Sequence, residues 1–422
     1  MAASDALLGL PIFGSAFVLE DVAVLGAALL VVISKFAMFR SEEGKLGACV
    51  VLAGVLVWPL HKVLQKVPFR SLPAGLKKIV RWEFWPPAVF YLPVVVKYAL
   101  LALRYRSLSL PTLANPGMQT GGLIGESKFE TLADLERAQP GFTAETHLVR
   151  FASVEQQADE ICRVRREHHL AYPLVLKPDV GQRGDGFRVI HSDEEARAYA
   201  ARFARDVLVQ AYVPGPEEAG IFYYRFPHEA RGKIFTITEK VFPMVTGDGR
   251  HTLEELIRRD PRASIVAGTY LERFAGQRKR VLAPGECLKL VEAGNHCQGA
   301  IFLDGGRLYS AELEKQIDEI SQSVPGFFVG RYDVRYTSED ALRAGRDFRI
   351  IELNGISSEA TNIYDPANSL WSAYRTLFRQ WEIIFAIAAG NRSLGLPPTA
   401  LRTIWGNWTR YRQRSAVYTV SD

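Results

Sequence analysis

Two neighbouring apolar segments, 327–335 and 349–355, constrain this chain most because both carry acidic or amide side chains in a strand pattern. The connection between them contains the Ser, Asp and Gly residues that a hairpin needs. Alternate side chains share one face of a strand, so Glu352 and Asn354 face the same way, and Asp333 can join them from the preceding strand. Carboxylate and amide oxygens are the ligands that Mg²⁺ takes when it also binds substrate phosphates. The pattern therefore predicts either a magnesium site on a sheet or a solvated hairpin with its charges in water.

The basic excess of the chain lies beside its most apolar stretches. Residues 1–110 contain 12 Lys and Arg but only 6 Asp and Glu, whereas the whole chain has a net charge of +5, so the remainder is close to neutral. This distribution favours a membrane partner and argues against nucleic acid. The four cysteines lie far apart without metal-ligand spacing, which fits a reducing compartment. Cys297 lies next to His296, and we interpret it as an ordinary buried thiol and not as a nucleophile.

Three apolar runs predict membrane-associated helices within residues 1–106, at about 20–40, 46–66 and 84–104. The first two form a helical hairpin that spans the membrane or is deeply embedded in it. The third has an aromatic start that suits the interface, and it either spans or lies in the membrane plane. The loop 61–81 carries six Lys and Arg and no acidic residue, so the positive-inside rule predicts that this loop faces the cytoplasm. We expect a bacterial-type inner membrane with the catalytic domain on its cytoplasmic side. The alternative is a set of core helices in a soluble domain.

The rest of the chain alternates strand patterns with helix patterns, which is typical of an α/β fold. We expect an irregular connector at 107–125, a catalytic domain at 126–395 with a lid lobe at about 150–215, and a basic C-terminal tail at 396–422. Strands are predicted at 172–178, 187–190, 207–213 and 233–244. Capping patterns predict helices that begin after Ser192 and Thr252.

One of these strands ends in Lys177 and leads into a turn that contains Gly181, Gly184 and Gly186. Glycines let backbone N–H groups approach phosphates closely, and the ammonium group supplies positive charge. The turn is not a Walker A loop, because the G-x-x-x-x-G-K-[ST] pattern is absent. It is therefore interpreted either as a phosphate clamp or as an ordinary flexible turn.

Four motifs in this order resemble the ATP-grasp superfamily, and most closely its D-alanine–D-alanine ligase branch of carboxylate–amine ligases. They are Lys177-Pro178 with the glycine turn, 207–217, 330–334 and 352–354, and the resemblance covers roughly residues 126–365. The segment 245–257 is also similar to one in cyanophycin-synthetase-type ligases. The resemblance implies an α/β (α+β) ATP-grasp fold whose two lobes clasp ATP. Here the membrane hairpin stands where the family's usual substrate-binding lobe would lie.

The resemblance also implies roles for individual residues. Asp333, Glu352 and Asn354 would hold Mg²⁺, as two ions, with Mn²⁺ as a substitute. Arg331 would stabilise the oxyanion and the transferred phosphate. Lys240 and Arg225 would contact phosphate or substrate, although Arg225 can also be a solvated strand residue. The residues implied to bind ATP are Lys128, Lys177, Gly181, Gly184, Gly186, Gln210, Ala211, Tyr212, Val213, Glu217 and Glu218.

The function expected from this resemblance is an ATP- and Mg²⁺-dependent ligase that joins a carboxylate to an amine through an acyl phosphate. The membrane segment suggests that one substrate is amphiphilic or lipid-linked. Two alternatives remain open on the sequence alone. One is an ATP-grasp phosphotransferase, and the other is a non-catalytic membrane scaffold that keeps a nucleotide-binding fold.

Overall fold

The computed structural model describes residues 80–415 except 182–183, 185, 293 and 295–298. The membrane helices predicted at 20–40 and 46–66 lie outside the described residues, as do His296 and Cys297. The chain divides into two compact units, 1–93 and 94–422. The described part of the first unit contains the 3₁₀ helix η2 (Trp82–Phe84) and the short helix α5 (Pro87–Phe90).

The third predicted membrane helix is observed as two pieces, α5 and α6 (Leu92–Arg104). Helix α6 has 13 residues, which at 1.5 Å per residue gives a length of about 20 Å. The hydrocarbon core of a bilayer is about 30 Å thick, so α6 alone is too short to span it. Across the described part of the chain, no helix combines the length and the apolar character needed to cross a membrane.

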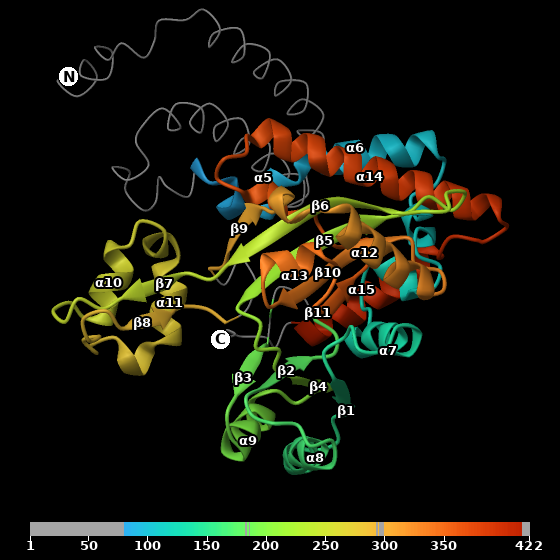
Figure 1. The fold of residues 1–422 in the computed structure, drawn as a ribbon. Coiled ribbons are helices and arrows are strands. Elements are labelled where there is room, and N and C mark those ends of the chain that lie inside the picture. The colour runs from blue at the N-terminus through green and yellow to red at the C-terminus, as the bar shows by residue number, and fades with distance from the viewer. Residues whose placement is uncertain (1–79, 182–183, 185, 293, 295–298, 416–422) are drawn as a thin grey trace, which may run out of the picture. The chain divides into compact units, whose positions relative to one another are not determined.

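The second unit contains a four-stranded antiparallel sheet in the order β1-β4-β2-β3 (Figure 1). Helices α8 (Val154–Glu167) and α9 (Asp193–Arg202) pack on one face of this small sheet and form an apolar core with it. Ser192 caps α9 by accepting a hydrogen bond from the Glu195 backbone N–H, as predicted. The strands are β1 (Thr146–Val149), β2 (Leu174–Pro178), β3 (Arg188–Ile190) and β4 (Val207–Ala211).

A five-stranded antiparallel sheet in the order β11-β10-β5-β6-β9 forms the centre of the second unit. Its strands are β5 (Glu217–Tyr224), β6 (Lys233–Val241), β9 (Ile301–Asp304), β10 (Val329–Tyr336) and β11 (Phe348–Asn354). Helices α7 (Lys128–Ala138) and α12 (Ala311–Ser323) bury one face with apolar side chains. On the opposite face, α14 (Leu370–Ser393) covers the end of the sheet that carries Phe222 and Val329. The rest of that face carries the polar side chains of Glu218, Lys240 and Asp333, with Phe302 of β9 opposite Lys240.

The predicted strands at 172–178, 187–190 and 207–213 are confirmed as β2, β3 and β4. The predicted hairpin at 327–355 is confirmed as β10 and β11, with the short helix α13 (Glu339–Arg343) in the connection. The predicted strand at 233–244 is two strands, β6 and β7 (Met244–Thr246). Pro243 lies between them, and proline cannot donate a hydrogen bond to a sheet.

A two-stranded sheet, β7 with β8 (Cys287–Lys289), lies beside two short helices. The first of these, α10 (Leu253–Arg259), begins with the predicted capping box between Thr252 and Glu255. The second is α11 (Ala267–Arg273). The C-terminal region predicted as a basic tail contains the helix α15 (Leu401–Ser415). The remaining 3₁₀ helices are η3 (Leu110–Leu113), η4 (Gln119–Gly122), η5 (Ala263–Val266), η6 (Ala275–Gln277), η8 (Gly306–Leu308) and η9 (Thr361–Tyr364).

The connector predicted at 107–125 has no strand or α-helix, but it is packed against the large sheet. Asn115 is fully buried and anchors it to β10. Its Nδ2 donates to the Val329 carbonyl at 2.7 Å, and its Oδ1 accepts from the Phe328 and Val329 N–H groups. These bonds satisfy backbone groups at the start of β10 and thereby fix the strand that carries the predicted site residues.

Candidate active site

The polar face of the large sheet carries a buried array of five charged side chains from its central strands. Glu218 on β5 lies opposite Lys240 on β6 and opposite Arg335 on β10. The Nζ atom of Lys240 is 2.8 Å from Glu218 Oε1 and 3.2 Å from Asp333 Oδ1. Arg331 Nε is 3.0 Å from Asp333 Oδ1, and Arg335 Nε is 3.3 Å from Glu218 Oε2. Among these five side chains, two carboxylates are paired with three cations, which gives the array itself one net positive charge.

A glycine at the centre of the array allows these groups to meet. Gly220 lies opposite Asp333 on one side and opposite Thr238 on the other. A Cβ atom at Gly220 would lie 3.2 Å from Arg331 Cδ and 3.3 Å from Asp333 Oδ1. Because no side chain stands there, Lys240 can reach diagonally across β5 to Asp333.

The charges in the array stabilise one another against the cost of burial. Burial by itself raises the pKa of Asp333, but the charges of Arg331 and Lys240 outweigh it and hold this pKa below its ordinary value. Burial likewise lowers the pKa of Lys240, whereas Asp333 and Glu218 raise it by more. The array is therefore fully ionised at neutral pH. Removing one partner would leave a buried charge uncompensated, which typically costs about 3–5 kcal/mol.

Lys177 approaches the same region from the small sheet. Its Nζ donates to the Ile351 carbonyl on β11 at 2.9 Å, and Gln210 Nε2 donates to the same oxygen at 3.2 Å. The Ile351 carbonyl is not used in the pairing of β10 with β11, because the register of the two strands shifts at this point. Asp333 is opposite Glu352, whereas Val334 is opposite Ile350, so Ile351 has no partner in β10. Bulges of this kind often accompany active sites. Burial lowers the pKa of Lys177 to about 8, although the nearby Glu352 carboxylate opposes this effect.

Lys128 and Glu126 complete the charged region from the start of α7. Lys128 Nζ donates to the Gly181 carbonyl of the glycine turn and lies 3.5 Å from Glu352 Oε1. Glu126 is not among the residues predicted from the sequence. Its burial raises its pKa to about 7, while Lys128 and the Gly355 N–H lower it. Its Oε2 atom is buried without a hydrogen-bond partner in the described part of the chain, so this carboxyl is poised to exchange a proton near neutral pH.

The predicted magnesium ligands lie on one face of β10 and β11. Asp333 and Glu352 are directly opposite each other, and Asn354 is opposite Arg331. The Asn354 Nδ2 atom is buried and has no hydrogen-bond partner among the residues described. Two carboxylates and one amide in adjacent positions form a hard oxygen donor set that fits Mg²⁺. Asp333 is at the same time paired with Lys240 and Arg331, so metal and cations would share it.

Most of the residues predicted to bind the nucleotide lie in the glycine turn of the small sheet or near residues 212–216, where the chain passes from β4 to β5. Gly184 and Gly186 have φ angles of +72° and +68°, which favour glycine. The Val213 carbonyl accepts from Arg335 Nη1 at 3.0 Å, and the Tyr212 ring centroid is 5.0 Å from the Arg335 guanidinium carbon. Ala211 ends β4, and Glu217 begins β5 opposite Tyr336.

The structure brings all but one of the predicted catalytic residues together. Arg225 follows the far end of β5, where its guanidinium stacks on Phe328 at 4.6 Å from the ring centroid and apart from the array.

Sequence reasoning missed Arg335 and Gly220. The alternation Arg331, Asp333, Arg335 could have revealed Arg335, because all three share a face of one strand. Gly294 lies against the array, since a Cβ atom there would be 2.2 Å from Glu218 Oε1.

Comparison with known sequences finds cyanophycin synthetases. The chain is 31% identical to the cyanophycin synthetase of Geminocystis herdmanii over 155 residues, which cover 32% of this chain and 17% of that protein. It is 30% identical to the one from Synechocystis sp. over 155 residues, with the same coverage. The chain thus spans less than a fifth of the length of these curated relatives. No protein-family model matches the chain.

Solved structures of ligases are also similar to parts of the chain. The VanG D-Ala:D-Ser ligase from Enterococcus faecalis has a TM-score of 0.35 at 14% identity, over 64% of this chain and 62% of that one. The bifunctional glutathione synthetase from Pasteurella multocida has a TM-score of 0.32 at 17% identity, over 62% of this chain and 38% of that one. The sequence similarity to cyanophycin synthetases confirms that this chain resembles the ATP-grasp ligases, as its motifs predicted.

Proposed function

We propose that the chain is an ATP- and Mg²⁺-dependent ligase that joins a carboxylate to an amine through an acyl phosphate. The observation that carries this proposal is the buried array with one net positive charge, which Lys177 approaches from the small sheet. The similarity to cyanophycin synthetases supports the same reaction class.

The array is suited to a reaction in which negative charge accumulates on oxygen. Arg331 and Lys240 are preorganised by Asp333, so their orientation need not change as charge develops. Lys177 and Lys128 supply further positive charge beside the glycine turn, where we place the phosphates of ATP. Asp333, Glu352 and Asn354 would hold Mg²⁺, which when bound neutralises phosphate oxygens.

The proposed reaction has two steps and needs no covalent nucleophile from the protein. A substrate carboxylate attacks the γ-phosphate of ATP, which releases ADP and forms an acyl phosphate. An amine then attacks the acyl carbon and expels inorganic phosphate. The two sheets that meet at Ile351 would exclude water, which otherwise hydrolyses the acyl phosphate.

We further propose that the protein associates with a membrane, with its catalytic domain in the cytoplasm and with an amphiphilic or lipid-linked substrate. The apolar runs and basic excess of residues 1–110 support this part of the proposal. Helix α6 adds to it, because four of its apolar side chains are more than half exposed. They are Val95, Val96, Leu100 and Leu103, at 60%, 52%, 59% and 75%.

The test is to incubate the full-length protein in detergent or vesicles with ATP, Mg²⁺ and an extract of lipids and amino acids. A ligase should release ADP and inorganic phosphate in equal amounts with a new amide, which mass spectrometry identifies. The Asp333→Asn variant should fold and lose this activity. A phosphorylated product without free phosphate would instead indicate a phosphotransferase, and equal activity in Asp333→Asn would remove the proposed site.

A further inference from the structure

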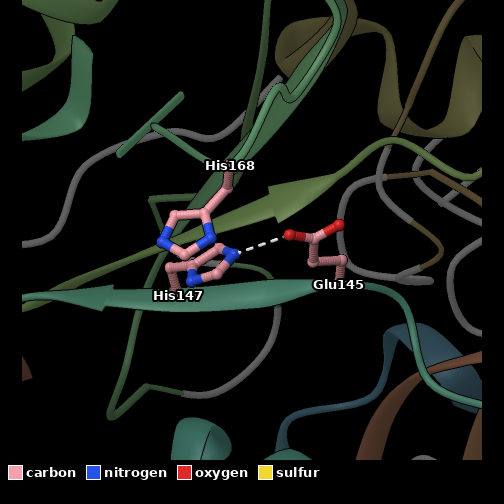
Figure 2. A group of neighbouring side chains, drawn as sticks. All are labelled: Glu145, His147 and His168. Carbon is pink, nitrogen blue, oxygen red and sulfur yellow. Dashed lines mark hydrogen bonds and ion pairs between the residues drawn. The ribbon is translucent and has the colours of Figure 1, made fainter. Parts of the chain in front are cut away.

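A group of side chains whose types can ligate a metal lies at the small sheet, apart from the array. Glu145, His147 and His168 each point a ligand atom into a common space, and these atoms all lie within 4.8 Å of one another (Figure 2). His147 Nε2 is 2.9 Å from Glu145 Oε1. The two imidazole rings stack with their centroids 3.7 Å apart and an interplanar angle of 28°.

The fold explains why these three residues meet. His147 is opposite Val209 in the β1–β4 pair, on the face of the small sheet that packs against α8. His168 is the C-cap residue of α8, so the helix ends directly over His147. Glu145 directly precedes β1, and its carboxylate lies beside the His147 ring. Two parts of the lobe that are separate in sequence, the segment 145–147 and the end of α8, therefore converge.

The charge and chemistry of this place suit a divalent transition-metal ion. The C-terminus of a helix carries partial negative charge and favours a cation. The two arginines in the last turn of α8 are engaged elsewhere: Arg165 Nε is 3.2 Å from Asp193, and Arg166 Nε donates to the Cys162 carbonyl. Two imidazoles and one carboxylate match the ligands of zinc sites that keep a fourth position for water. A metal ion would also interact favourably with the lone pairs on the ring nitrogens of His147 and His168.

The location gives such a metal a structural consequence. The Ala144 N–H donates to the Ile350 carbonyl of the large sheet at 2.9 Å, and the Glu145 carbonyl accepts from the Ala211 N–H of the small sheet at 2.8 Å. The chain therefore crosses from one sheet to the other at Glu145. We propose that Glu145, His147 and His168 bind one Zn²⁺-type ion, which fastens the end of α8 to this crossing segment. The proposal is independent of the ligase activity.

The test uses full-length protein without a histidine tag, freed of metal by chelation, and titrated with Zn²⁺ or with Co²⁺ as a spectroscopic probe. The wild type should bind one ion at this site, and Zn²⁺ should raise its melting temperature. His147→Ala and His168→Ala should each weaken binding by at least about tenfold, the lower end of what loss of even an outer-shell partner costs. His191→Ala, which removes an exposed histidine of the same lobe, should bind as the wild type does.

The metal site of the large sheet provides a second control. Asp333→Asn should leave Co²⁺ binding at the histidines unchanged, because Asp333 lies on β10 in the other sheet. Equal Zn²⁺ and Co²⁺ affinity in the wild type and in both histidine variants would overturn the proposal. A Co²⁺ spectrum without nitrogen ligation, in protein whose circular dichroism shows it to be folded, would overturn it as well.

Discussion

Replacing Lys177 by methionine should separate the stability of the protein from its nucleotide binding. Burial lowers the pKa of Lys177 from 10.5 to about 8, so keeping it charged at neutral pH costs about 3 kcal/mol at about 1.4 kcal/mol per pKa unit. Its hydrogen bond to the Ile351 carbonyl offsets about 1.5–3 kcal/mol of this cost, and Gln210 still donates to that oxygen in the variant. Lys177→Met should therefore leave the free energy of unfolding unchanged or raise it by up to about 2 kcal/mol. ATP affinity should instead fall by about 2–3 kcal/mol, or about 30–150-fold.

Urea unfolding and calorimetric titration with ATP measure the two effects separately. Lys315→Met provides the matched control, since that side chain is 77% exposed and should change neither quantity. The wild type should also gain stability between pH 8 and 10.5, because the unfolded chain binds more protons there than the folded one does, and Lys177→Met should lose this gain. Unchanged ATP affinity in Lys177→Met, or a loss of more than about 3 kcal/mol of stability, would refute the reasoning.

Three further substitutions test the surroundings of the array. Gly220→Ala should displace the Arg331 guanidinium, since its Cβ would lie 3.2 Å from Arg331 Cδ, and should lower kcat by about tenfold or more in a steady-state assay. Glu218→Gln should reduce the free energy of unfolding by about 3–5 kcal/mol in urea, because it leaves buried Lys240 and Arg335 undercompensated. Burial raises the pKa of Glu126 to about 7, so this side chain keeps its proton in the folded state between pH 4.5 and about 7. The unfolded chain loses that proton at lower pH, so the free energy of unfolding should fall by up to about 3 kcal/mol as pH rises through that range. Unfolding curves of Glu126→Gln should lack this fall.

The sequence was sufficient to locate the strands that carry the chemistry. The alternation of apolar and charged residues in 327–335 and 349–355 predicted both strands and the shared face of Asp333, Glu352 and Asn354, because period-two patterning is a local property. The predicted interpretation as a solvated hairpin is excluded for Asp333, which is only 5% exposed. The resemblance then placed Lys177 and Lys240 in the same site.

Other features depend on contacts between distant parts of the chain. The register shift that frees the Ile351 carbonyl is decided by the pairing of β10 with β11, and no single segment encodes it. Glu126 has a raised pKa only because the fold buries it beside Gly355, more than two hundred residues later. Arg225 was assigned to the site through the resemblance, yet it lies beyond the end of β5 against Phe328.

The fate of the carboxylate oxygen tests the central claim most directly. The full-length protein would be incubated with ATP, Mg²⁺ and a pool of lipids and amino acids whose carboxylates carry a heavy-oxygen label. If an acyl phosphate forms and an amine displaces it, the released inorganic phosphate carries one labelled oxygen for each amide formed, and Asp333→Asn produces neither. Release of ADP with unlabelled phosphate, or transfer of phosphate to a product without amide formation, would contradict the proposed ligase reaction.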